Sequence, residues 1–118
     1  MKKIVSIVIP VYNESGNLIT MLEKLYEIFS DEYRYEVIFV DDGSSDDTME
    51  LLRRISAEDS RVFYISFSRN FGQLNALKAG LDRATGDCVI TLDGDLQHPP
   101  ALIPEMLACW EQGYDTLF

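Results

Sequence analysis

The stretch Ile4-Val5-Ser6-Ile7-Val8-Ile9 decides the fold of this 118-residue chain. It is β-branched and almost continuously apolar. A strand of this kind is typically buried on both faces, as in a parallel sheet covered by helices. The stretch therefore predicts a buried strand of an α/β domain.

Further apolar runs and helical patterns alternate outward from this strand. Residues 37–40, 62–67 and 88–92 form similar short apolar runs. Between and after them, apolar residues recur at helical spacing in 18–29, 49–55, 74–84 and 102–110. We expect Gly86 to close the third helix in the left-handed conformation. The order predicts a Rossmann-like, mostly parallel sheet with helices on both faces.

The bulk composition indicates one domain, residues 1–118. Ten basic and twenty acidic residues give a net charge of −10, which argues against nucleic acid as a partner. An acidic chain that handles a phosphorylated ligand needs a divalent cation as mediator. Cys88 and Cys109 are interpreted as small buried hydrophobes. No apolar run approaches the roughly 20 residues that span a bilayer, so we expect a soluble, cytoplasmic chain.

The informative residues follow the strands, because parallel α/β sheets bind ligands at the carboxyl ends of their strands. Asp93-Gly94-Asp95 comes directly after the run 88–92, and Gln97 follows two residues later. Such oxygen donors suit Mg²⁺ or Mn²⁺. The alternative is an ordinary Asp-Gly turn, since an aspartate-rich chain contains such a triplet by chance.

A second acidic pair, Asp41-Asp42, follows the run 37–40. Asp41 is placed to accept a hydrogen bond from a base or a ribose hydroxyl. The next residues, 44–46, are also good N-caps for the following helix. Two further residues have two interpretations each: Arg69 meets a phosphate or forms a surface ion pair, and His98 acts directly or only packs.

Four motifs resemble those of family 2 glycosyltransferases. They are Val8-Ile9-Pro10-Val11-Tyr12-Asn13-Glu14, Val40-Asp41-Asp42-Gly43-Ser44-Ser45-Asp46, Ser68-Arg69-Asn70-Phe71-Gly72 and Asp93-Gly94-Asp95-Leu96-Gln97-His98-Pro99-Pro100. The last ending is similar to dolichyl-phosphate mannose synthases and bacterial enzymes that glycosylate undecaprenyl phosphate. The resemblance implies a glycosyltransferase A fold and a UDP- or GDP-linked sugar as donor.

The same resemblance implies a role for each matching position. The residues that line the nucleotide-sugar pocket would be Pro10, Tyr12, Asn13, Glu14, Phe39, Asp41, Asp42, Asp93, Gly94 and Asp95. Within this set, Phe39 and Asp41 would hold the base, and Asp42 would lie beside the ribose. Asp93, Asp95 and Gln97 would hold Mg²⁺ or Mn²⁺, and the two aspartates would be the catalytic residues. A single in-line displacement would invert the anomeric carbon.

Members of this family continue well beyond Phe118, so we expect the chain to be the N-terminal portion of a longer enzyme. The later part would bind a polyprenyl phosphate at the cytoplasmic face of the membrane. Alone, the chain should not glycosylate that lipid, and an uncovered sheet edge should favour a homodimer. The rival interpretations are a haloacid-dehalogenase-like phosphatase and, among non-enzymes, a receiver-type signalling module. Both normally place their acidic residues after the first strand.

Overall fold

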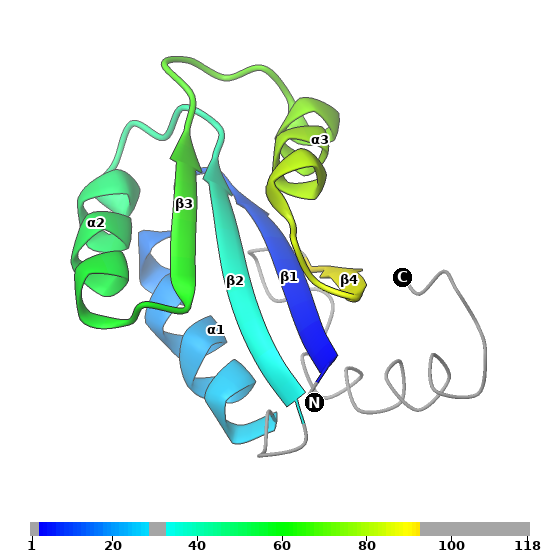
Figure 1. The fold of residues 1–118 in the computed structure, drawn as a ribbon. Coiled ribbons are helices and arrows are strands. Elements are labelled where there is room, and N and C mark those ends of the chain that lie inside the picture. Colours follow the sequence, from blue (N-terminus) through cyan, green and yellow to red (C-terminus); the bar gives the residue numbers. More distant parts are fainter. Residues whose placement is uncertain (1–2, 29–32, 93–118) are drawn as a thin grey trace.

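The structure is a computed structural model that describes residues 3–28 and 33–92. Its parallel strands are β1 (Lys3–Val11), β2 (Tyr33–Asp41), β3 (Val62–Ser66) and β4 (Cys88–Thr91). They form one sheet in the order β3-β2-β1-β4 (Figure 1). The helices are α1 (Ser15–Ile28), α2 (Thr48–Glu58) and α3 (Gln73–Arg83). The helix expected near 102–110 lies outside the described residues.

Helices cover both faces of the sheet, as the alternating pattern predicts (Figure 1). Successive residues of a strand point to opposite faces. Val37 and Phe39 therefore join the larger core, together with the apolar faces of α1 and α2. Ile38 and Val40 join the smaller core beneath α3. The expectation of a strand buried on both sides is confirmed, and Cys88 is buried as expected.

The strand β1 lies between β2 and β4 and includes a proline near its carboxyl end. Val11 accepts a hydrogen bond from the Asp42 amide, and Val8 accepts one from the Leu92 amide. The backbone N–H and C=O groups of successive β1 residues therefore point alternately toward β2 and toward β4. The nitrogen of Pro10 points toward β4. Pairing with β2 continues past the proline to Val11 and Asp41, so the strand does not end at Pro10.

A buried carboxylate fixes the connection between α3 and β4. Glu36 lies on β2 and is 8% exposed. Its Oε1 accepts hydrogen bonds from the Ser6 hydroxyl at 2.7 Å and the Thr85 amide at 2.8 Å. Burial alone would raise the pKa of Glu36, but the hydrogen bonds from Thr85 and Ser6 bring it below its ordinary value.

This connection corrects the prediction for Gly86. Only Gly43 and Gly72 among the described glycines have positive φ, so Gly86 does not close α3 in the left-handed conformation. The helix ends instead at Arg83, and the next residue, Ala84, is its C-cap with an extended backbone. Close approach explains the glycine, because a Cβ on Gly86 would lie 2.5 Å from the Ser6 hydroxyl oxygen.

An aromatic and charged cluster joins α1, α2 and β3 at the amino edge of the sheet. The Tyr26 hydroxyl donates to Asp59 at 2.6 Å, and the Arg61 Nε donates to the same carboxylate at 3.1 Å. Burial and the neighbouring Asp59 carboxylate raise the pKa of Tyr26, so the phenol keeps its proton. Arg61 also lies over the Tyr35 ring.

No described helix is long and apolar enough to cross a membrane.

Candidate functional site

The carboxyl ends of the strands meet at one edge of the sheet. Val11 on β1 pairs with Asp41 on β2, and Asp41 pairs with Ser66 on β3. On the other side of β1, the Leu92 amide donates to the Val8 carbonyl at 3.0 Å. The chain passes from β3 at one side of the sheet to β4 at the other, so strand order reverses beside β1. Open α/β sheets bind their ligands at this point.

Asn13 ties the turn after β1 to the loop after β2. Its φ of 53° lies in the left-handed region, which asparagine tolerates better than most residues. The side-chain Oδ1 accepts hydrogen bonds from the amides of Ser45 at 2.8 Å and Asp46 at 3.2 Å. In return, the Asn13 amide donates to the Ser44 hydroxyl at 2.9 Å. The two loops therefore form one unit at the carboxyl edge.

Glu14 and Thr48 extend this unit to the starts of the two helices. The Glu14 amide donates to the Thr48 hydroxyl oxygen at 3.1 Å, and the Thr48 amide donates to Asp46 at 2.9 Å. Burial alone would raise the pKa of Asp46, but hydrogen bonds from Thr48 and Ser15 lower it, so the carboxylate stays ionised. The N-cap of α2 is Asp47 and not one of the predicted residues 44–46, although Asp46 accepts from the first amide of the helix. Asp47, at the N-cap itself, makes no side-chain capping bond.

The acidic pair after β2 is buried, and its two members differ in their contacts. Asp41 is 2% exposed, and its Oδ1 accepts a hydrogen bond from the Ser44 amide at 3.0 Å. Asp41 Oδ2 has no recorded partner within the described part of the chain. Asp42 uses both oxygens, accepting from the Phe71 amide at 2.7 Å and the Gly72 amide at 3.1 Å. Asp41 therefore keeps an acceptor for a ligand, whereas Asp42 is committed to the protein.

The other residues expected at the pocket divide between the surface and the core. Tyr12 is 47% exposed at the carboxyl edge, and Pro10 is half-buried at the end of β1. Phe39 is completely buried in the larger core, so the structure gives it a packing role. Contact of Phe39 with a base stays a prediction.

The expected metal ligands Asp93, Asp95 and Gln97, together with Gly94 and His98, lie outside the described residues. The described part of the chain reaches Leu92, which directly follows β4. Within 3–28 and 33–92, no group of three or more His, Cys, Asp or Glu residues is arranged to hold a metal ion. The proposed donor set is chemically suitable, since carboxylate and amide oxygens are the ligands that Mg²⁺ and Mn²⁺ prefer.

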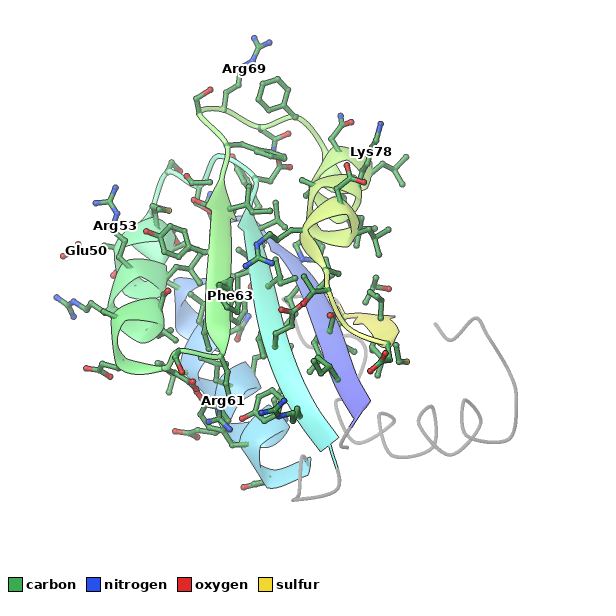
Figure 2. All side chains as sticks on the ribbon, in the orientation of Figure 1. Glu50, Arg53, Arg61, Phe63, Arg69 and Lys78 are labelled. Carbon is green, nitrogen blue, oxygen red and sulfur yellow. The ribbon has the colours of Figure 1, made fainter. Side chains whose placement is uncertain are left out.

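Arg69 lies on the connection between β3 and α3, at the same end of the sheet (Figure 2). Its guanidinium lies over the Phe71 ring, 4.7 Å from the centroid. Both ion pairs recorded among the described residues involve other arginines, namely Arg54 and Arg61. The surface ion pair weighed for Arg69 is therefore not formed there. A phosphate contact remains a prediction.

The hydrogen bonds that hold the site together follow no sequence pattern. Resemblance places Asn13 in the pocket, but it does not predict the bonds of Asn13 to the loop after β2. Away from the site, Glu36 at the α3–β4 connection is not among the predicted residues. A signal for it exists in the sequence, because an acid directly before the buried run 37–40 needs hydrogen-bond partners if the strand buries it.

Comparison with known proteins identifies the family of the chain. Residues 6–118 match the family model described as "Glycosyl transferase family 2". The undecaprenyl-phosphate 4-deoxy-4-formamido-L-arabinose transferase of Proteus mirabilis is 48% identical over 115 residues, covering 96% of this chain and 35% of that protein. Its counterpart in Shewanella sediminis is 46% identical with the same coverage. The chain therefore spans about a third of the length of these curated relatives.

Solved structures show the same architecture. The mannosyltransferase PcManGT from Pyrobaculum calidifontis, in complex with GDP-Man and Mn²⁺, is 29% identical with a TM-score of 0.70, over 80% of this chain and 28% of that chain. S. aureus TarS 1-349 in complex with UDP is 25% identical with a TM-score of 0.68, over 91% and 33%. The expected glycosyltransferase A fold is confirmed, and the phosphatase and receiver alternatives find no support. The chain belongs to glycosyl transferase family 2.

Proposed function

We propose that this chain carries the donor-binding part of an enzyme that transfers a sugar from a UDP- or GDP-linked donor to a polyprenyl phosphate. Family membership and the names of the curated relatives support the reaction class and the acceptor. The structural neighbours with GDP-Man and with UDP support a nucleotide donor. The reaction would take place at the cytoplasmic face of the membrane that holds the lipid.

The observation that carries the proposal is the buried carboxylate of Asp41 at the carboxyl edge, beside the reversal of strand order. Asp41 is 2% exposed and the Ser44 amide binds its Oδ1, so Oδ2 is the oxygen that a ligand can reach. A base N–H or a ribose hydroxyl would donate to this oxygen. Tyr12 and the turn formed by Asn13 and Glu14 would line the pocket around the nucleotide.

Asp93, Asp95 and Gln97 would hold Mg²⁺ or Mn²⁺. When bound, the ion would supply Lewis-acid stabilisation of the charge on the departing diphosphate. An acceptor phosphate oxygen would attack the anomeric carbon as the bond from that carbon to the diphosphate oxygen breaks. The attack comes from the face opposite the leaving group, so the configuration would invert. The described residues would contribute by holding the donor in line for this attack.

Asp41→Ala tests the nucleotide site. Loss of a charge-assisted hydrogen bond costs about 1.5–3 kcal/mol, so UDP or GDP should bind about tenfold more weakly or worse. Isothermal titration with Mn²⁺ present measures this, and circular dichroism follows the melting temperature. Asp47→Ala is the matched control, because Asp47 is exposed and makes no side-chain capping bond. Equal affinities in both variants would refute the role of Asp41.

The acceptor and the assembly need separate measurements. The complete polypeptide that carries residues 1–118 should glycosylate a short polyprenyl phosphate when given labelled UDP-glucose or GDP-mannose. The 118-residue chain alone should bind donor without this transfer, and robust transfer by it would show that the acceptor site is misplaced. We also propose a homodimer, for which sedimentation over a range of concentrations is the direct test.

A further inference from the structure

The carboxylate of Asp42 anchors the connection between β3 and α3. Its two oxygens accept hydrogen bonds from consecutive backbone amides, those of Phe71 and Gly72, at 2.7 and 3.1 Å. The side chain is 5% exposed, so little of it is available to any ligand. Two bonds to two adjacent amides fix both the position and the plane of the carboxylate. This is the geometry of an anchor and not of a ribose contact.

Gly43 brings the same two loops into backbone contact. Its φ of 75° is a conformation that other residues rarely adopt. A Cβ at this position would lie 2.3 Å from the carbonyl carbon of Arg69 and 2.5 Å from the nitrogen of Asn70. Backbone atoms cannot move aside as a flexible side chain can. The loop after β2 therefore contacts the segment 69–72 directly, through the backbone at Gly43 and through the carboxylate of Asp42.

The anchored segment presents a cation at the carboxyl edge. Phe71, whose amide is held by Asp42, packs edge-on against Phe67 with ring centroids 5.5 Å apart. The guanidinium of Arg69 lies over the Phe71 ring, which limits its positions while leaving it exposed. Figure 2 shows Arg69 beyond the end of the sheet, at the opposite end from Arg61. An exposed guanidinium that lies against a ring, on a segment in backbone contact with the loop after β2, suits a phosphate group.

We propose that Asp42 is a positioning residue, which holds the segment 69–72 so that Arg69 binds a phosphate group of a substrate. The inference rests on the proposed function and deepens it. The phosphate belongs to the donor diphosphate or to the lipid acceptor, and both offer the same chemistry to a guanidinium. Asp42 acts through Arg69 and does not touch the substrate.

A double-mutant cycle tests this coupling in the complete polypeptide that carries residues 1–118. Asp42→Asn, Arg69→Ala and the double variant are compared by titration with UDP and GDP in the presence of Mn²⁺, and by KM for a short polyprenyl phosphate. Each single change should weaken one of these two interactions about tenfold. The double variant should be no weaker than the worse single variant, because both changes remove the same contact. Lys78→Ala, an exposed cation on α3, is the charge control and should leave both values unchanged.

The outcomes separate the roles. A nucleotide effect assigns Arg69 to the donor, and an acceptor KM effect assigns it to the lipid phosphate. Losses that multiply to about a hundredfold in the double variant would overturn the proposal, since Asp42 would then act independently of Arg69. Unchanged affinities with a lowered melting temperature would also overturn it and leave Asp42 a purely structural role. Wild-type protein that binds neither nucleotide refutes the proposed function itself.

A second variant covers the case in which Asp42→Asn does not fold. Gly43→Ala should displace the segment 69–72 while leaving the carboxylate of Asp42 intact. It should give the same loss as Arg69→Ala and faster hydrogen exchange at the Phe71 and Gly72 amides. Gly16→Ala is the matched control, because nothing lies within 4 Å of a Cβ at that position. Undiminished substrate binding in Gly43→Ala, despite faster exchange at those amides, would overturn the proposal.

Discussion

Removing the carboxylate of Glu36 should detach the α3–β4 connection and destabilise the domain. In Glu36→Ala, the Ser6 hydroxyl and the Thr85 amide lose the oxygen that lies 2.7 and 2.8 Å from them. Each polar group left unsatisfied costs about 1–3 kcal/mol, so the free energy of unfolding should fall by about 3 kcal/mol. Glu36→Gln keeps an oxygen acceptor and loses the charge, so a fall of about 1–2 kcal/mol is expected.

Urea unfolding of the two variants measures these losses, with Glu23→Ala as the control because Glu23 is an exposed glutamate on α1. The pH dependence supplies an independent check. The folded pKa of Glu36 lies below its ordinary value of 4.5, so its stabilisation is fully present above pH 4.5. It is lost as the pH falls through the folded pKa, and Glu36→Gln should lack this part of the acid sensitivity. A loss under about 1 kcal/mol in Glu36→Ala, with wild-type acid sensitivity in Glu36→Gln, would refute the reasoning.

Two shorter predictions concern the metal and the packing of α3. Nucleoside diphosphate and Mn²⁺ should bind interdependently. EDTA and Asp95→Asn should therefore each weaken the binding of UDP or GDP, as measured by calorimetry. Equal affinity in all conditions would remove the metal from the mechanism. Gly80→Ala should lower the free energy of unfolding by about 1–3 kcal/mol, because overpacking strains a filled core. The new Cβ would lie 2.3 Å from Cγ1 of the buried Val8. If Gly80→Ala melts at the same temperature as Gly16→Ala, the predicted loss of stability is wrong.

The sequence predicts the elements of this fold well because each depends on a local pattern. The run 4–9 becomes β1, and the alternation of strands and helices gives a parallel sheet with both faces covered. The boundaries shift by a few residues where tertiary contacts decide them. Strand β1 extends through Pro10 because its other side pairs with β2 as far as Val11 and Asp41.

The contacts within the site are harder to predict, since they join residues far apart in the chain. Asp42 and Phe71 are separated by 29 positions, and no periodicity links them. The sequence alone does not distinguish the adjacent residues Asp41 and Asp42. Only the folded backbone shows that both oxygens of Asp42 accept from amides, while Asp41 Oδ2 has no partner among the described residues. Gly86 illustrates the same limit, because its conformation follows from contacts with β1.

The central place of β1 also sets an order of events during synthesis. Val5 pairs with Tyr35 on one side and with Cys88 on the other. At about 5–20 residues per second, the ribosome takes roughly 3–10 s to make the stretch between those two partners. During that interval, one side of an apolar strand carries unpaired amides and carbonyls, the arrangement through which strands of different molecules associate. Slower translation of residues 36–87 should therefore raise the aggregated fraction of newly made protein, and a chaperone that shields nascent chains should lower it.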